Sequence, residues 1–251
     1  MTSKKWAQLF ILSLGIIFVM LSFLIHRNEN NIIVDINIVF LSIGCSIISV
    51  VIINYIEYLT TLPERETIKS VNTWGLKSIY ETRAEMNNYT NKLLVSAKEL
   101  DIAVFGAKGL INYQGNTIKE RLKQKMIMRI LIPMINSEYI AQREKDENAI
   151  NGEITKTIND LKNWVQLTKN ELGLSDNSLS IMQYNYLPIE SIMRIDNDLF
   201  VGPFMARKVS QLTMAYHYHK GGKGYDYYND YFNDIWNNSL NNNINKVSTV
   251  K

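Results

Sequence analysis

The hydrophobic pattern begins with two long apolar runs that carry no charge, Trp6 to Ile25 and Ile36 to Ile56. As helices rising about 1.5 Å per residue, both are long enough to cross a hydrocarbon layer of about 30 Å. The polar connection at 26–35 is short, so the runs predict a transmembrane hairpin with spans at about 6–25 and 36–56. A signal peptide is not favoured, because the first run exceeds the usual apolar centre and no small-residue cleavage site follows it.

Lysine and arginine positions predict the orientation of this hairpin. Lys4 and Lys5 precede the first run, Arg65 and Lys69 follow the second, and the connection contains only Arg27. The positive-inside rule therefore places both termini in the cytoplasm, with the hairpin in the cell (inner) membrane and the lipid bilayer as a partner.

Small residues recur along the second run, at Ser42, Gly44, Ser46 and Ser49. Such residues let helices approach closely. They fit self-association into a homo-oligomer, and equally well packing within the hairpin itself.

Beyond the hairpin, the pattern first predicts helices. Residues 57–73 form a linker and the start of a helix, with Pro63 in a first turn, and helical spacing continues from Ile68 to about Leu100 with a break near Gly75. A strand at 101–105, a helix at 117–124 and a strand at 125–132 follow, an order that favours parallel pairing. Two further helices are expected at 136–147 and 150–172, the first capped by Ser137 and the second ended by Gly173.

Alternating and apolar runs then predict three short strands within residues 179–204, LSIMQYNYLPIESIMRIDNDLFVGPF. Turns at 187–188 and 197–198 separate them. A β-type run at 211–219 and an aromatic amphipathic helix at 225–240 complete the pattern, before a polar tail at 241–251 that we expect to be disordered. The fold class is α/β, a mixed sheet flanked by helices, preceded by a two-helix transmembrane hairpin.

The order strand, proline, strand, Ile-Asp, turn, strand, glycine resembles the core of the phospholipase D-like family. The segments WGLKSIYETR, DIAVFG, MRILIP and REKDE fit the same family, so the resemblance covers about residues 74–238, a cytosolic domain. Active members carry His-x-Lys a few residues before an aspartate. Counting back from Asp196 places these positions at Ile189 and Ser191, and no His-x-Lys occurs anywhere in the chain. The resemblance is therefore to a non-catalytic bacterial branch, and it argues against the family's hydrolysis.

Candidate ligand-binding residues gather around this degenerate motif. Asp196 ends an apolar strand, where α/β proteins often place working groups. Arginine side chains commonly bind phosphate groups. Lys108 lies in the turn Gly106–Gly109, which follows a strand as phosphate-binding loops do, but this turn lacks their glycine spacing and precedes no immediate helix. The candidates are Lys108, Arg194, Asp196, Asp198 and Arg207; salt bridges at a strand edge and a plain turn are the alternatives.

His217 and His219 alternate along one strand, so both rings face one side and form a weak candidate for a metal site. A third ligand would have to come from an aspartate, and ordinary surface or hydrogen-bonded histidines are the alternative. The single cysteine, Cys45, excludes a disulfide framework and a cysteine-based zinc site. We expect no cofactor.

The charge composition bears on whether the protein binds nucleic acid. The 251-residue chain has a formal net charge of +3, which is no polyelectrolyte signature, so nucleic acid is not expected as a partner.

Three functions fit these observations. The first is a membrane-anchored sensor or effector, of the plan seen in bacterial stress and anti-phage defence, that binds a phosphate-bearing small molecule or a protein. The second is a metal-assisted phosphodiesterase or nuclease with displaced catalytic residues. The third is a membrane assembly protein. We favour the first, which is not an enzyme.

Overall fold

The computed structural model describes the backbone of residues 3–25 and 31–248 and the side chains of 6–24 and 36–240. The basic head at 1–5, the connection residue Arg27 and the last three residues of the predicted tail lie outside this description in whole or in part. Contacts divide the chain into two units, Met1–Lys69 and Ser70–Lys251.

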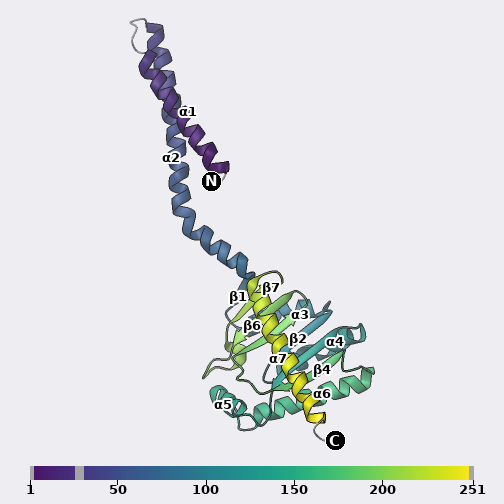
Figure 1. Cartoon of the computed structure of the whole chain (residues 1–251). Coiled ribbons are helices and arrows are strands. Elements are labelled where there is room, and N and C mark those ends of the chain that lie inside the picture. The colour runs from purple at the N-terminus through teal and green to yellow at the C-terminus, as the bar shows by residue number, and fades with distance from the viewer. Residues whose placement is uncertain (1–2, 26–30, 249–251) are drawn as a thin grey trace. The chain divides into compact units, whose positions relative to one another are not determined.

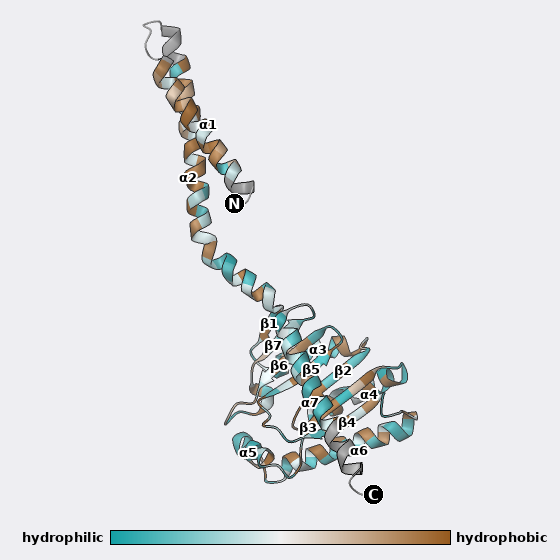
Figure 2. Cartoon of the chain, viewed as in Figure 1, coloured by the Kyte–Doolittle hydropathy of each residue, from teal (hydrophilic) through white to brown (hydrophobic). Residues whose placement is uncertain are grey.

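The first unit contains two apolar helices, α1 (Ser3–Ile25) and the first part of α2 (Asn31–Trp74), which lie side by side (Figure 1). Both are long and apolar enough to cross a membrane, with mean hydropathies of 2.4 and 2.6, and their side chains are mostly exposed. Figure 2 shows hydrophobic residues along both helices. A Cβ on Gly44 would lie 2.6 Å from Val19 Cγ2, and one on Gly15 would lie 2.9 Å from Ile47 Cγ2. Gly15 and Gly44 are therefore used for close packing within the hairpin.

Helix α2 is continuous through Pro63, so the predicted new helix at this residue is wrong. The expected break near Gly75 is confirmed, but the helix expected to continue from there to about Leu100 is wrong in its first part. Gly75, with φ +67°, ends α2, and the chain forms an edge strand, β1 (Leu76–Tyr80), and a separate helix, α3 (Arg83–Leu94). A Cβ on Gly75 would lie 2.8 Å from Gly222 Cα, so close backbone contact requires glycine at this break.

The second unit is a seven-stranded mixed sheet with the order β1-β7-β6-β5-β2-β3-β4. Strand β2 pairs in parallel with β3, and β3 with β4; all other neighbours are antiparallel. The predicted α/β fold class, a mixed sheet flanked by helices, is confirmed. The strands after β1 are β2 (Glu99–Ala103), β3 (Ile127–Pro133), β4 (Leu179–Tyr184), β5 (Glu190–Ile195), β6 (Asp198–Pro203) and β7 (Ala215–His219).

Helices cover both faces of this sheet (Figure 1). On one face, α3 packs with α4 (Lys108–Lys123), α5 (Glu138–Glu147) and α6 (Glu153–Leu172) over a core that includes Ile102, Ile130 and Ile158. On the other face, α7 (Lys223–Ser248) buries Phe232 and Trp236 against Leu131 and Leu199. A short 3₁₀ helix, η1 (Ser210–Leu212), precedes β7.

The helix ends test three sequence expectations. Gly173 ends α6 with φ +61°, as expected. Ser137 is the N-cap residue of α5, but its hydroxyl makes no capping bond. Helix α7 continues to Ser248, although a disordered tail was expected from residue 241.

Candidate functional site

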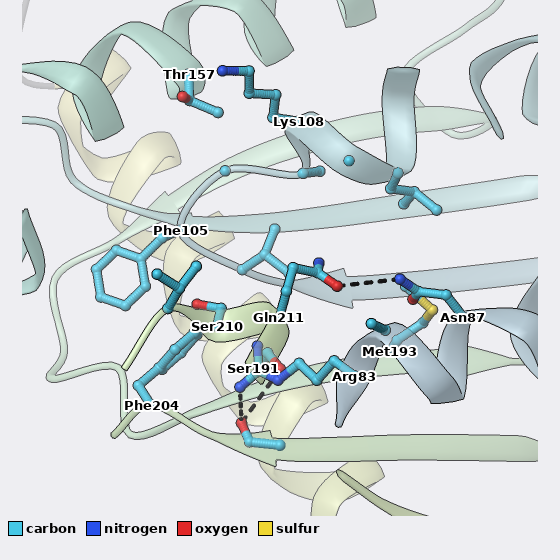
Figure 3. A pocket seen from close by; sticks show the side chains of 18 of the residues that line it. Arg83, Asn87, Phe105, Lys108, Thr157, Ser191, Met193, Phe204, Ser210 and Gln211 are labelled. Carbon is cyan, nitrogen blue, oxygen red and sulfur yellow. Dashed lines mark hydrogen bonds between the residues drawn. The ribbon is translucent and has the colours of Figure 1, made fainter. Parts of the chain in front are cut away.

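A cavity of about 860 Å³ opens at the sheet edge where β2 and β6 end and β5 and β7 begin. We call it the carboxyl-edge cavity. Its walls come from α3, the segment after β2, the start of α6, and the loop between β6 and β7 (Figure 3). Its lining includes Arg83, Lys108, Ser191, Phe204, Ser210 and Gln211.

Arg83 opens α3 and its side chain is buried at this cavity, with 7% of the residue exposed. Thr82 caps the helix by accepting a hydrogen bond from the backbone N–H of Glu85, and Glu85 accepts one from Glu81 N. This capping-box arrangement fixes where the helix starts and thus where the arginine points. Arg83 Nη2 donates to Gly202 O at 2.6 Å and to Pro203 O at 2.8 Å.

Gly202 makes room for this guanidinium. A Cβ there would lie 2.5 Å from Arg83 Nε, closer than real contacts allow. Arg83 Nε is buried and has no hydrogen-bond partner within the described residues.

The charge of Arg83 is poorly compensated. Burial and, to a smaller extent, repulsion from Arg143 lower its pKa to about 10, although Glu147 opposes both effects. The group still carries a full positive charge at neutral pH. Among the described residues it forms no direct ion pair with a carboxylate.

A second buried arginine, Arg143 of α5, holds the loop that forms one wall. Arg143 Nη1 donates to Met205 O at 2.9 Å, and Nη2 donates to Lys208 O at 3.1 Å and to Ser210 Oγ at 3.0 Å. Its Nη2 also pairs with Glu147 at 2.5 Å, and Glu147 accepts from Ser210 Oγ. The hydrogen-bonding capacity of Arg143 is therefore largely used within the protein.

The ring of Phe204 lies close to both guanidinium groups. The Cζ atoms of Arg83 and Arg143 are each 5.1 Å from its centroid, within the range of cation–π contacts. Phe105 packs edge-on against the same ring at 4.8 Å. These contacts fix the position of the cationic end of the cavity.

Lys108, one of the sequence candidates, lines the carboxyl-edge cavity. It is the first residue of α4, so the expectation that the Gly106–Gly109 segment precedes no immediate helix is wrong. Helical spacing was recognised only from residue 117, because the glycines at 109 and 115 weaken the pattern before it. A Cβ on Gly106 would lie 2.6 Å from Thr157 Cγ2, which explains the glycine before the helix.

The two positions that correspond to His-x-Lys lie at the same edge. Ile189 precedes β5 and is 63% exposed, and Ser191 lines the cavity. Ser191 Oγ donates to Gly202 O at 3.3 Å, the carbonyl that also accepts from Arg83 (Figure 3).

Arg194 lies away from this cavity, in a buried ion-pair cluster on the α7 face of the sheet. Its Nε donates to Asp101 Oδ2 and its Nη1 to Glu99 Oε2, both at 2.7 Å, while Arg129 Nε donates to Asp101 Oδ1 at 2.7 Å. Burial would lower the pKa of Arg194, but Asp101 and Glu99 outweigh it and raise the pKa above its ordinary value. The alternative interpretation of Arg194, a salt bridge on the sheet, matches this geometry.

Asp196 and Asp198 lie at the opposite sheet edge. Strand β5 runs antiparallel to β2, so its carboxyl end meets the start of β2 rather than the cavity. Asp196 Oδ1 accepts from the backbone N–H groups of Lys98 and Glu99 at 2.9 and 2.8 Å. This strand therefore ends at the edge opposite the cavity, and a functional role for Asp196 there stays a prediction. Arg207 is exposed on the loop after β6, so the four motif residues do not form one cluster.

His217 and His219 do face one side of β7, and both approach Asp198. His217 Nε2 is 2.7 Å and His219 Nδ1 is 3.4 Å from Asp198 Oδ1, and Lys77 Nζ is 3.3 Å from the same oxygen. Burial lowers the pKa of His217 despite its bond to Asp198. Among the described residues, no group of three or more His, Cys, Asp or Glu side chains is arranged to hold a metal ion.

Sequence reasoning missed Arg83 and Arg143. Each lies in a helix among other charged residues, and nothing in the local pattern indicates burial. The sequence Thr82-Arg83-Ala84-Glu85 contains the capping-box signal that would have located the start of α3.

No protein-family model and no curated protein matches the chain. Among solved structures, it is similar to TrmBL2, an archaeal chromatin protein described with a novel mode of DNA binding, and to NucT from Helicobacter pylori, a phospholipase D-like nuclease. The TrmBL2 match has a TM-score of 0.44 and 10% identity and covers 78% of this chain and 69% of that chain. The NucT match has a TM-score of 0.39 and 13% identity and covers 64% of this chain and 96% of that chain.

At these TM-scores neither likeness carries an argument about the activity of this chain. The two structures do overturn the sequence-based exclusion of nucleic acid, because one belongs to a DNA-binding protein and the other to a nuclease. The exclusion rested on a net charge of +3 for the whole chain. A sum over all residues says nothing about the local concentration of cations, such as Arg83, Arg143 and Lys108 beside one cavity.

Proposed function

We propose that the second unit is a non-catalytic, phospholipase D-like binding domain that takes a phosphate-bearing ligand in the carboxyl-edge cavity. The apolar hairpin anchors it in the cell membrane with both termini in the cytoplasm, as a sensor or effector. The observation that carries this proposal is the buried Arg83 guanidinium, which borders the cavity without a direct carboxylate partner.

Burying an ion costs several kcal/mol unless a nearby charge compensates it. Arg83 receives two carbonyl contacts and a distant contribution from Glu147, which is itself bonded to Arg143. A phosphate group in the cavity would supply the missing negative charge through charge-assisted hydrogen bonds. The hydroxyl groups of Ser191 and Ser210 line the cavity near Arg83 and add donors, and Lys108 adds a positive charge from the far side of the cavity, beside Thr157 (Figure 3).

The residues present support binding without hydrolysis. The family's chemistry needs a histidine nitrogen as nucleophile, and the two corresponding positions hold Ile189 and Ser191. His217 and His219 lie on β7 near Asp198, at the edge opposite the cavity. Lys77 occupies the same carboxylate oxygen, which speaks against the metal-assisted alternative.

Thermal melting of the full-length chain in detergent tests this proposal. The probes are pyrophosphate, ribose 5-phosphate and the four common 5′-ribonucleotides. A ligand at one hundred times its Kd stabilises by about 2.7 kcal/mol, equivalent to a rise in Tm of roughly 5–10 °C. We expect at least one probe to reach this range, with the rise lost in Arg83→Gln and reduced in Lys108→Gln.

The exposed Arg207→Gln is the matched control and should keep the full shift, since Arg207 does not line the cavity. The proposal would be overturned if no probe raised the Tm of the unchanged protein, or if the probes raised the Tm of Arg83→Gln and Lys108→Gln as much as that of the unchanged protein. An alkaline carbonate wash of membranes tests the proposal that the hairpin is a membrane anchor. The full chain should remain with the membranes, and its release would contradict the anchor.

A further inference from the structure

The carboxyl-edge cavity is larger than a phosphate group requires and has a second, chemically different end. Its volume of about 860 Å³ falls within the range of about 300–1,000 Å³ that is typical of sites for whole organic ligands. Arg83, Phe204 and Ser210 mark the cationic end. The remaining space must therefore be assigned to the rest of the ligand.

Side-chain amides line the cavity from three different elements. Helix α3 contributes two, α4 two and η1 one: Asn87, Asn91, Asn112, Gln114 and Gln211. We call these residues the amide wall. A carboxamide is planar and carries a donor and an acceptor side by side, and it is uncharged at every physiological pH.

Two of these amides are hydrogen-bonded to each other. Asn87 Nδ2 donates to Gln211 Oε1 at 3.2 Å, which joins α3 to the loop wall (Figure 3). The Nε2 group of Gln211 points toward α4, lying 3.9 Å from a Cβ built on Gly109. Donor and acceptor atoms of α3 and η1 thus meet in the cavity, beside the first turn of α4.

An aromatic side chain and apolar surfaces complete this end. Tyr113 of α4 borders the cavity and is 84% exposed, so its ring face is free to cover a ligand. Met193 and Val104 supply apolar lining from the sheet. Planar amides beside an aromatic ring are the groups that proteins use to read the edge and the face of a nucleobase.

We propose that the ligand is a nucleotide unit, with its phosphate at Arg83 and its base against the amide wall and Tyr113. This inference rests on the proposed function, because it assigns the second half of the same ligand. The unit is either a free 5′-nucleotide or the 5′-phosphorylated end of a single strand, which share this chemistry.

Calorimetry in detergent measures the affinity of the full-length chain for three kinds of probe and tests this assignment. The probes are ribose 5-phosphate, the 5′-ribonucleotides, and a 5′-phosphorylated tetranucleotide of the base that binds best. We expect the best nucleotide to bind at least about tenfold more tightly than ribose 5-phosphate, because base-edge hydrogen bonds are made only with the base.

The variants separate the two ends of the cavity. Asn87→Ala and Asn91→Ala should each weaken the nucleotide about fivefold or more and leave ribose 5-phosphate unchanged, whereas Arg83→Gln should weaken both. The matched control is Asn88→Ala, which changes the neighbouring exposed asparagine of α3 and should alter neither affinity. A tetranucleotide that binds more tightly than the mononucleotide identifies a strand end, and the reverse identifies a free nucleotide.

The possible failures are distinguishable. If ribose 5-phosphate binds as tightly as every nucleotide, or the asparagine variants bind nucleotides normally, this inference is overturned and the phosphate-binding function stands. If no phosphate compound binds in a manner that depends on Arg83 or Lys108, both are overturned.

Discussion

Two buried arginines of the same domain, Arg83 and Arg194, have opposite electrostatic surroundings. Arg194 is bonded to Asp101 and Glu99, and these carboxylates raise its pKa above the ordinary value. Arg83 is bonded to two backbone carbonyls, and burial with Arg143 nearby lowers its pKa to about 10. Burial alone therefore does not identify a binding residue; the missing counter-charge does.

The comparison also separates the two sides of the sheet by role. The Arg194 cluster joins β2, β3 and β5 on the α7 face and is closed by its own carboxylates. The Arg83 site lies at the carboxyl edge and is open to a cavity. We infer that the first stabilises the fold and that the second is left for a ligand.

The largest expected effect comes from breaking the closed cluster. Asp101→Ala removes the carboxylate shared by Arg129 and Arg194. It leaves Arg129 without a carboxylate partner among the described residues and Arg194 with Glu99 alone, which should cost about 3–5 kcal/mol of unfolding free energy. Urea denaturation of the full chain in detergent measures it. Asp176→Ala, at an exposed pair with Lys169, is the control and should change stability by under about 0.5 kcal/mol. A loss from Asp101→Ala as small as that of the control would contradict the assignment.

A medium effect is expected from closing the space beside Arg83. In Gly202→Ala the new Cβ would lie 2.5 Å from Arg83 Nε, so the guanidinium must shift. Overpacking of this kind costs about 1–3 kcal/mol, and the phosphate-dependent rise in Tm should fall with it. Thermal melting with and without ribose 5-phosphate reports both quantities. Gly152→Ala is the control for backbone strain, because Gly152 has a positive φ but a Cβ there would meet nothing within 4 Å. It should lower Tm without changing the rise in Tm that ribose 5-phosphate causes.

The smallest expected effect is on the pH dependence of stability, through His217 at the sheet edge opposite the cavity. The pKa of His217 is lowered by burial, so the unfolded chain binds its proton more readily than the folded chain. Its contribution to stability is complete above its unfolded pKa of about 6.5 and is lost as the pH falls toward the folded pKa. Stability should therefore decline modestly below about pH 6.5, and His217→Phe should flatten this part of the curve. Denaturation midpoints from pH 7.5 to 5 test it, and an unchanged slope in the variant would refute the role of His217.

The sequence predicted much of the sheet because its strands are locally marked. Residues 179–204 alternate and are bounded by turns, and the structure has three strands there with nearly the expected limits. Strand β1 was missed because Leu76–Tyr80 is a short edge strand whose spacing also fits a helix; its pairing partner, β7, lies more than 130 residues later in the chain.

The site was harder to predict because it depends on strand direction and on tertiary burial. The aspartates of the motif were expected to cluster with Arg194 and Arg207, but antiparallel pairing of β5 places them at the edge opposite the cavity. Arg83 has no local signature, since its burial arises from Gly202 and Phe204, about 120 residues away. Lys108 was named as a candidate because its position after an apolar strand is local information, and its binding role stays a prediction.

The shared acceptor at Gly202 has a consequence for how such a domain can change over time. Its carbonyl oxygen receives both Ser191 Oγ and Arg83 Nη2, so a lysine introduced at position 191 would bring a second cation to an atom that already binds one. A histidine at position 189 alone would lack the phosphate-holding partner. Introducing His-x-Lys at these two positions would thus require the loss of Arg83 together with both gains.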